Sequence, residues 1–446
     1  MKGIFFLSLF LFAEAALSAQ TLNLERAREL ALANSRSLAR YELAIRGSIL
    51  DERNQLYSML PSVSAGYNAS IDYLNVRDSG FINPADTFSA RATLSVTQII
   101  FQGGKSFIQK AISAIATESV RKDALAEYFN MLDSADNAYY AVLESYAALE
   151  AEESSLQAAV LALSIAEIRR ESGMINQGDY LKALADAEAR ENSRNQTRRN
   201  LSLNITKLKA LIGVNETFDL EQIDFSAYEE VLMRLSAISD EQANALFENF
   251  WDLLVTANPS LAKAALSSER AERNLALSIR DYSPTLTATV FSTGLNYSTA
   301  GGFNPTVQGG VTLTGSIPVD FWVMNNRIER SRIALDSARL DYINAESSLE
   351  MELGTAVLNA LSQAGTVLSS RRSLEYAEKH FEYVMERYRL LQSSVSELSD
   401  ASTLLINNRN THIRASYAFL QSLSRLRSLC ALDDEERLIN ILMGNS

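Results

Sequence analysis

Cysteine, histidine and proline are scarce in this sequence, with one Cys, two His and six Pro among 446 residues. Cys430 has no partner for a disulfide within the chain, and no cysteine follows the N-terminal apolar segment to carry a lipid. His380 and His412 are too far apart for a metal pair on one helical turn, and no nucleophile motif or glycine-rich phosphate loop accompanies them. We therefore expect neither an enzyme nor a protein that needs a cofactor or metal.

Long apolar runs are also missing. Beyond the N-terminus no run approaches the roughly 18 residues of a transmembrane helix, so we expect none, and strands would have to cross any membrane. The net charge of −13 argues against nucleic-acid binding, which depends on basic patches. Residues 1–19, MKGIFFLSLFLFAEAALSA, have a basic start at Lys2, an apolar core and small residues near Ser18, which is typical of a secretory signal peptide. The sequence therefore predicts an acidic exported protein.

The sequence contains an internal duplication. LALANSRSLARYELAI (30–45) resembles LLVTANPSLAKAALSS (253–268), and Pro61 matches Pro284 at the same offset along the chain. Near the ends of the copies, Leu211 matches Leu429 at a slightly shorter offset. Such self-similarity indicates two copies of one structural unit. We predict a first repeat over 20–213, a joining segment over 214–240, a second repeat over 241–430 and a C-terminal tail over 431–446.

Each repeat contains two segments with the alternation of a β-strand. In VSAGYNASIDY (63–73) apolar residues alternate with Ser, Gly, Asn and Asp, and FSARATLSV (88–96) follows the same rule. The second repeat offers TLTATVFSTGLNY (285–297) and VQGGVTLTGSIPV (307–319). A tilted strand needs about 9–11 residues to cross a bilayer, a length that each segment reaches. We predict β-hairpins over 63–101 and 285–319, and a soluble antiparallel sheet with one wet face stays open as the alternative.

Aromatic residues cluster at the strand ends, which suits a girdle at a membrane–water interface. They are Tyr73, Phe88, Phe101, Tyr297, Phe303, Phe321 and Trp322. RDSGFINPADT (77–87) and GGFNP (301–305) carry turn residues without a strand pattern, so we predict extracellular loops there. FQGGK (101–105) and FWVMNNR (321–327) would be the two periplasmic turns from strand to helix.

The predicted helices have matching lengths. Residues 104–172 contain no internal Pro or Gly and predict one helix of about 104 Å at 1.5 Å per residue. The flanking helices, 23–60 and 179–212, together reach about 108 Å. The second repeat gives a long helix over 325–391, with shorter helices over 242–282 and 398–430 that again add up to its length. We predict that two short helices stack into one column beside each long helix.

Heptad-like spacings support helix-on-helix packing. The predicted seam of the second long helix consists of Leu353, Val357, Ala360, Ala364, Val367, Arg371, Leu374, Glu378, Phe381, Met385 and Tyr388. In the first long helix it consists of Tyr139, Val142, Tyr146, Leu149, Leu156, Val160 and Leu163. These spacings alone also allow a plain dimeric coiled coil. Because four strands cannot close into a barrel, we expect several chains to combine their strands.

The duplicated order of elements, together with PSVSAGY (61–67), TQIIFQGGK (97–105) and ESGMINQGDYLKALADAEA (171–189), resembles the TolC-type outer-membrane efflux proteins over about residues 21–430. The resemblance implies a mainly α fold with transmembrane β: a two-repeat protomer with long helical hairpins that form a periplasmic α-barrel. Four strands per protomer would contribute to a trimeric 12-stranded outer-membrane barrel. It also implies a homotrimer in contact with outer-membrane lipid. Its partners would be a periplasmic adaptor and an inner-membrane transporter of the RND, ABC or MFS type.

The resemblance also implies roles for residues at the periplasmic tip. Gly173 and Met174 would form the first helix–turn–helix, with Asp179 at the start of the returning helix. In the second copy Leu391 occupies the glycine position, and Gln392 follows it. Ser393 stands where some members carry a basic gating residue. These turn residues are the expected contacts for the adaptor, and Asp179 is an expected gate residue.

Glu397 and Asp400 match two acidic residues that project into the pore in the family. Residues three apart share a helical face, so threefold symmetry would turn each into a ring of three carboxylates that favours cations. Ser394 and Glu397 also form an S-x-x-E capping box, so a purely structural role at the helix N-terminus remains open.

The leading functional hypothesis is a passive outer-membrane and trans-periplasmic channel that exports small molecules or polypeptides in a tripartite efflux or type I secretion system. A periplasmic adaptor is an alternative, but it would carry one hairpin flanked by unrepeated β-domains. A filamentous structural coiled coil is another, but it would not require amphipathic strands.

Overall fold

The computed structural model describes residues 21–72, 75–76, 82–83, 87–216, 218–298, 302–304 and 307–444. The expected signal peptide, Tyr73 and much of the two expected extracellular loops lie outside these residues. The chain divides into two compact units. Of the described residues, the helical unit comprises those within 21–36, 127–255 and 351–444, and the strand-bearing unit comprises those within 37–126 and 256–350.

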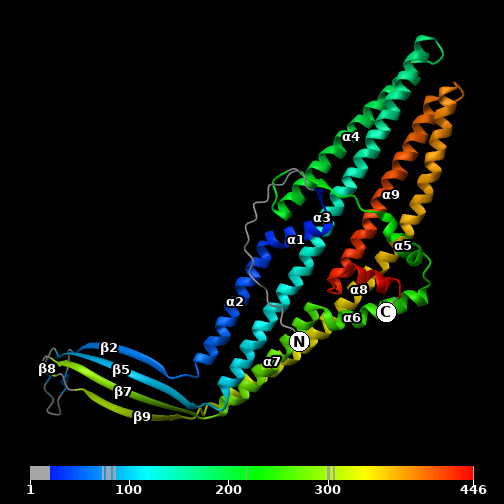
Figure 1. Cartoon of the computed structure of the whole chain (residues 1–446). Helices are drawn as coiled ribbons and strands as arrows, with labels where there is room; N and C mark the ends of the chain where they lie inside the picture. The colour runs from blue at the N-terminus through cyan, green and yellow to red at the C-terminus, as the bar shows by residue number, and fades with distance from the viewer. Residues whose placement is uncertain are drawn as a thin grey trace. The chain divides into compact units, whose positions relative to one another are not determined.

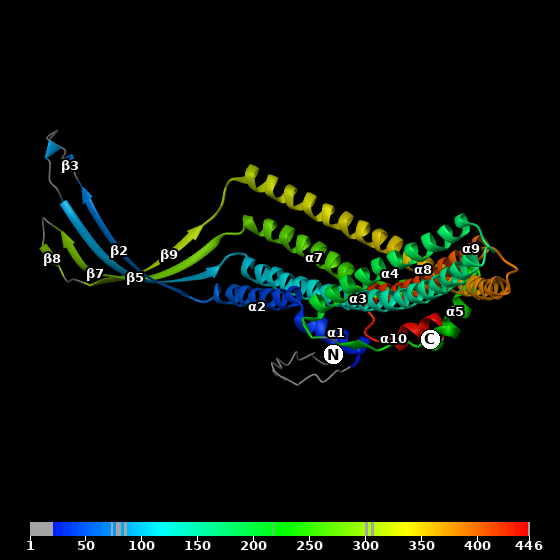
Figure 2. The same cartoon turned by 90° about the horizontal axis from the view of Figure 1, so that it is seen from above.

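The strand-bearing unit contains one antiparallel sheet built from both repeats. Its four long strands are β2 (Ser62–Asp72), β5 (Thr87–Phe101), β7 (Thr285–Ser298) and β9 (Gln308–Ser316). β2 pairs with β5, β5 with β7, and β7 with β9, so the four strands lie side by side in that order (Figures 1 and 2). The short β8 (Gly302–Asn304) also pairs with β7, and β3 (Asn75–Val76) pairs with β4 (Ile82–Asn83). Both predicted hairpins are present, and the β5–β7 ladder joins them.

The register of this sheet separates an apolar face from a hydroxyl-rich face. Val63, Val96, Val290 and Val311 are direct partners across the four strands. One position along, Ser62, Thr97, Thr289 and Thr312 form a parallel row of hydroxyl side chains on the opposite face. Val63, Val290 and Val311 are 69%, 52% and 75% exposed, so the apolar row is uncovered in the single chain. The predicted alternation is confirmed. The single chain therefore exposes a large apolar face, which is typical of a surface that contacts another surface.

The two strand-to-helix turns differ. After β5, Gly103 and Gly104 adopt positive φ angles of 64° and 78°, and α3 (Lys105–Glu171) begins directly afterwards. The prediction of a turn over 321–327 was wrong, because α8 (Phe321–Arg389) already begins at Phe321. The turn lies in residues 317–320, where Pro318 offers no N–H to continue the ladder and Asp320 favours a helix start.

Two expected helices are each broken once. The expected helix over 23–60 consists of α1 (Leu24–Asn34) and α2 (Arg36–Tyr57), and the one over 242–282 consists of α6 (Asp240–Ala257) and α7 (Pro259–Ile279). The breaks fall at Ser35 and Asn258, which are equivalent positions because they have the same offset as Pro61 and Pro284. Asn258 caps α7 by accepting from the backbone N–H groups of Ser260 and Leu261, and Pro259 disfavours helical backbone at Asn258.

The helical unit contains two long hairpins, which Figure 1 shows as α3 with α4 and α8 with α9. α4 spans Gln177–Ile212 and α9 spans Val395–Leu429. The joining segment carries β6 (Asp219–Leu220), the 3-10 helix η1 (Phe225–Tyr228) and α5 (Glu229–Ser236), and the C-terminal tail carries α10 (Glu435–Leu442). β6 pairs in parallel with β1 (Thr21–Leu22), and Tyr139 donates to the carbonyls of Leu22 and Glu221 at 3.0 and 2.8 Å.

The predicted helix stacking is visible where α1 meets α4. The side-chain amide of Asn34 donates to the carbonyls of Ala210 and Leu211 at 3.3 and 3.0 Å, so it satisfies carbonyls in the last turn of α4. The single cysteine lies at the end of α9. Cys430 is fully buried there, and this burial raises the pKa of its thiol to about 12.

The predicted seam of α8 is largely confirmed, whereas that of α3 was partly wrong. Leu353, Val357, Ala360, Ala364 and Val367 are each at most 3% exposed. In α3, Tyr139 and Val142 are buried, but Tyr146 and Val160 are 42% and 52% exposed. From Ser145 onward the buried positions of α3 are Ser145, Ala151, Glu152, Ser155, Ala159, Ala166 and Arg169. In this part of α3 most of the buried side chains are therefore small or polar, whereas Tyr146 and Val160 face outward.

Among the described residues, no helix combines the length and apolarity needed to span a membrane.

The turn after β5 gives a matched pair of glycine substitutions. A Cβ at Gly103 would lie 2.2 Å from the side chain of Ser283, whereas one at Gly104 would meet nothing within 4 Å. Both positions have positive φ, so each change to Ala costs about 1 kcal/mol for the backbone. We expect Gly103→Ala to lower the melting temperature clearly more than Gly104→Ala, and Ser283→Gly to restore part of the loss. Equal effects of the two alanine variants would contradict the close approach.

Candidate functional site

The two hairpin tips have the same backbone geometry although their residues differ. Gly173 and Leu391, which occupy equivalent positions in the two repeats, adopt φ angles of 70° and 66°. The N–H of Met174 donates to the carbonyl of Arg169 at 2.8 Å, and the N–H of Gln392 donates to that of Arg387 at 2.8 Å. Each helix therefore ends in a Schellman motif, in the second copy with a leucine where glycine is preferred. Met174 and Leu391 are 63% and 58% exposed.

The returning helices also begin alike. Asn176 and Ser394 are their N-caps, and their side-chain oxygens accept from the backbone N–H groups of Asp179 at 2.8 Å and Glu397 at 3.1 Å. Asp179 and Glu397 are therefore equivalent first-turn acids in the two repeats. Such acids favour the positive end of the helix dipole.

Glu397 and Asp400 lie on the exposed side of α9, away from the buried Val395, Leu398 and Ala401. Capping by Ser394 is confirmed, but no bond from the Glu397 side chain back to Ser394 occurs among the described residues. No ion pair to either carboxylate occurs among them either. Lys182, at the position of the first repeat that corresponds to Asp400, donates to Ser396 Oγ at 2.6 Å. The two acids are thus exposed in the single chain.

Behind the tips, Arg169 of α3 and Tyr388 of α8 connect the two hairpins. Tyr388 is fully buried, and the guanidinium of Arg169 lies 4.0 Å from the centre of its ring. Arg169 also donates to the backbone carbonyl of Tyr388, and the Tyr388 hydroxyl donates to the carbonyl of Ala162 at 3.3 Å. Burial raises the pKa of Tyr388, which keeps its hydroxyl protonated as a donor. The sequence analysis placed Tyr388 in the seam but missed Arg169.

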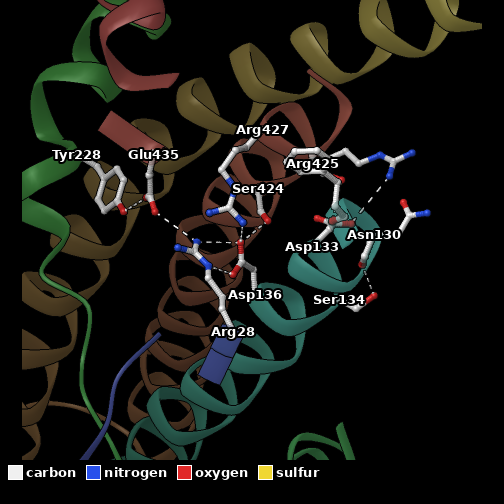
Figure 3. Close-up of polar contacts among 12 residues, drawn as sticks. Arg28, Asn130, Asp133, Ser134, Asp136, Tyr228, Ser424, Arg425, Arg427 and Glu435 are labelled. Atoms are coloured by element: carbon white, nitrogen blue, oxygen red, sulfur yellow. Dashed lines mark hydrogen bonds and ion pairs between the residues drawn. The ribbon is translucent and has the colours of Figure 1, made fainter. Parts of the chain in front are cut away.

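A second polar cluster lies deeper in the helical unit, around Asp136 of α3 (Figure 3). Asp136 is fully buried and accepts from Arg28 of α1 at 2.5 and 3.0 Å. It also accepts from Ser424 at 2.6 Å and from Arg427 at 2.7 Å, both on α9. The cluster therefore connects the start of the chain to both hairpins.

The cluster extends to the joining segment and the tail through Glu435 of α10. Glu435 accepts from Arg28 at 3.4 Å and from the Tyr228 hydroxyl at 2.5 Å. Burial, together with the Glu435 carboxylate, raises the pKa of Tyr228 above its ordinary value of 10. The two arginines and two acids balance in charge, which a buried ionic group requires. In the sequence, Asp136 is one of two acids, with Asp133, in a largely apolar stretch of α3, and this was the only local sign of the cluster.

The two histidines serve packing. His412 Nδ1 lies 3.1 Å from Ser370 Oγ, and the His380 ring stacks on that of Tyr376. Burial, with Arg371 adding to it, lowers the pKa of His412. Among the described residues, no group of three or more His, Cys, Asp or Glu side chains is arranged as metal ligands.

Comparison with known proteins gives one family and several similar folds. The family described as "Outer membrane efflux protein" matches residues 27–214 and 252–431. The solved structure of CusC matches with a TM-score of 0.77 and 15% identity, covering 95% of each chain. VceC from Vibrio cholerae, titled an outer membrane protein, matches at 0.73 and 16%, covering 92% of this chain and 97% of VceC. CmeC from Campylobacter jejuni, titled an outer membrane channel, matches at 0.72 and 15%, covering 95% of this chain and 89% of CmeC. None of the curated proteins matches.

The tip geometry leads to a stability prediction. Leu391 adopts a left-handed backbone that costs a side-chain-bearing residue about 1 kcal/mol, and the residue is more than half exposed. We expect Leu391→Gly to raise the melting temperature of the purified protein and Gly173→Leu, the reverse change at the equivalent site, to lower it. A lower melting temperature for Leu391→Gly would show that the leucine side chain stabilises the tip more than its backbone strains it.

The Asp136 cluster leads to a second prediction. Asp136→Asn leaves Arg28 and Arg427 buried with reduced charge compensation, so we expect the free energy of unfolding to fall by about 3–5 kcal/mol. Glu29→Gln is the control, because Glu29 and Arg26 form an ion pair whose side chains are 65% and 61% exposed. Removing that pair changes stability by less than about 1 kcal/mol. Denaturant titration of both variants measures the difference, and equal stabilities would contradict the role given to Asp136.

Proposed function

The chain belongs to the outer membrane efflux protein family, and from this membership we propose that three copies assemble into one export channel that works with an adaptor and an inner-membrane transporter. The chain is an outer-membrane efflux channel that extends into the periplasm, and it is not an enzyme. We propose the homotrimer, its partners and the roles of single residues. The cargo class we propose is small molecules or polypeptides leaving the cell envelope.

The observation that carries this proposal is the open four-stranded sheet. Within the described residues, β2 pairs only with β5 and β9 only with β7, so both outer edges are free. Neighbouring strands run in opposite directions, which allows β9 of one copy to pair antiparallel with β2 of the next. Three copies then close a ring of twelve strands and leave no edge. The exposed valine row would face lipid, and the hydroxyl row would face water.

The helices carry uncovered apolar side chains that a trimer would bury. Tyr146 and Val160 of α3 and Leu358, Tyr376 and Tyr383 of α8 are between 42% and 66% exposed. Such side chains are favourable in a wall of packed helices and costly in water. We propose that helices of adjacent copies cover them.

At the strand-to-helix junction, exposed aromatic residues support membrane contact. Phe101, Phe107, Phe321 and Trp322 are each at least half exposed. Amphipathic and aromatic rings at this level are typical of the interface between lipid and water.

We propose that the tips contact the periplasmic adaptor through Gly173, Met174, Leu391, Gln392 and Ser393. Glu397, Asp400 and Asp179 would then form acidic rings at the periplasmic mouth. In support, Glu397 and Asp400 are exposed and without an ion-pair partner among the described residues. The Arg169–Tyr388 contact would hold the two hairpins of each copy together when the mouth is closed, because it joins α3 to α8 directly behind the tips.

For the chain's organisation, we propose a signal peptide over residues 1–19. Two repeats over 20–213 and 241–430 would follow, with 214–240 as the joining segment and 431–446 as a tail.

The proposal is tested by expressing the full chain in a Gram-negative host. We expect it in the outer-membrane fraction as a trimer that survives SDS without heating, and we expect the purified trimer to conduct ions across planar lipid films. A monomeric protein without channel activity would refute the assembly.

The acidic rings are tested on the same films with a trivalent cation as blocker. A unit charge 4 Å away in water contributes about 1 kcal/mol per charge of the blocker, so Asp400→Asn should raise the half-blocking concentration by about tenfold or more. Asp400→Glu, which keeps the charge, is the matched control and should block like the wild type. Unchanged block in Asp400→Asn would refute the ring and leave the trimer standing.

A further inference from the structure

The wall of the helical unit contains a buried acid that has no cationic partner within the described part of the chain. Glu152 of α3 is 7% exposed, and its Oε1 accepts from the side-chain amide of Asn410 on α9 at 3.1 Å. Its other oxygen, Oε2, is buried and has no hydrogen-bond partner among the described residues. Asn410 Oδ1 and the hydroxyl of Ser155, which is 8% exposed, are likewise buried without a partner among them. Three oxygen atoms on α3 and α9 are therefore unsatisfied within the described structure.

From this arrangement we propose that Glu152, Ser155 and Asn410 bind a hard, oxygen-liganded cation between α3 and α9. Glu152 and Ser155 are three residues apart and share one face of α3. The hydrogen bond from Asn410 places α9 against the same carboxylate. Carboxylate, amide and hydroxyl oxygens are the ligands that Ca²⁺ and similar hard ions prefer, with water completing the shell.

Charge balance favours a cation over an empty site. Earlier on α3, Asp136 is fully buried, but it is paired with two arginines. No basic side chain forms an ion pair with Glu152 among the described residues, and Arg409, next to Asn410, is paired with Glu378 at 2.9 Å. A buried carboxylate without a counter-charge is costly, which favours a bound cation beside it.

A cavity beside the proposed site reaches Ser155, but Glu152 and Asn410 are not part of its lining. It has a volume of about 410 Å³, and Ser155 lines it together with Glu378, Glu382, Phe381 and Arg409. This volume is far above the roughly 30 Å³ that one water occupies in the liquid, so a hydrated ion fits. The lining carries two acidic residues, Glu378 and Glu382, and one basic residue, Arg409, so its net charge is negative. This charge raises the local concentration of cations.

A cation at this site would cross-link one hairpin to the other. α3 belongs to the first hairpin and α9 to the second, and the site lies further from the tips than the Arg169–Tyr388 contact. The occupied site would therefore stabilise the helical wall without touching the pore acids. The inference is independent of whether the channel conducts.

The test measures Ca²⁺ binding to the purified full-length protein after treatment with a chelator. Equilibrium dialysis against ⁴⁵Ca²⁺ is carried out with Asp179→Asn, Glu397→Gln and Asp400→Asn present in every variant, so that the proposed pore acids do not contribute. We expect one saturable Ca²⁺ per chain. Glu152→Gln should weaken binding by about tenfold or more, because it removes the only charged ligand. Glu153→Gln is the matched control, since Glu153 is exposed on the same helix turn and should leave binding unchanged.

A second variant, which should bind Ca²⁺ more tightly, distinguishes loss of the site from misfolding of Glu152→Gln. Asn410→Asp adds a second carboxylate to the site, so Ca²⁺ affinity should rise by about tenfold and the melting temperature should become strongly Ca²⁺-dependent. Equal Ca²⁺ binding in Glu152→Gln and Glu153→Gln, or no effect of Asn410→Asp, would overturn the proposal. The absence of saturable Ca²⁺ binding in the protein that retains Glu152 and Asn410 would also overturn it.

Discussion

The ladder between β5 and β7 is the contact on which the duplicated chain depends. It pairs Ser89 with Ser298 at one end and Phe101 with Leu286 at the other. Because β5 ends the first hairpin and β7 begins the second, the ladder turns two marginal hairpins into one four-stranded sheet. It also pairs the inner edges of the two hairpins, those of β5 and β7. Within the described residues, the outer edges of β2 and β9, one from each repeat, are therefore the ones left for further pairing. In the helical unit the Asp136 cluster has the corresponding role, because it connects α1, α3, α9 and α10 through one buried charge.

The two repeats keep a common backbone while their chemistry has diverged. At the tips the same left-handed position is filled by Gly173 and Leu391, and the same cap position by Asn176 and Ser394. One turn into the returning helix, Lys182 in the first repeat corresponds to Asp400 in the second. Opposite charges therefore occupy equivalent places on a duplicated scaffold. A single chain can thus present two chemically different surfaces at one end without changing its fold.

Local patterns predicted most of the elements, and long-range contacts explain most of the errors. The strands were predictable because one face is apolar and the other rich in hydroxyl groups, as in the Val63 and Ser62 rows. The sequence also contained a sign of the break at Asn258, since Asn followed by Pro is a helix-start signal. The helical periodicity on both sides nevertheless led to the prediction of one continuous helix.

The error in the seam of α3 has a different origin. Apolar side chains such as Val160 face away from the single chain, and the small residues beside them are buried instead. Arg169 and Asp136 were missed because their partners, Tyr388 and Arg427, lie in the other repeat, far away along the chain. No local pattern around either residue indicates which distant side chain it contacts.

Cys430 has a consequence for how this protein matures in an oxidising envelope. Its thiol is buried at the end of α9, and with a pKa of about 12 it carries almost no thiolate at neutral pH. Thiolate is the form that attacks disulfides and oxidants. Once folded, the protein therefore offers oxidoreductases no reactive thiol. Cysteines introduced elsewhere for thiol-specific probes will be labelled without interference from Cys430.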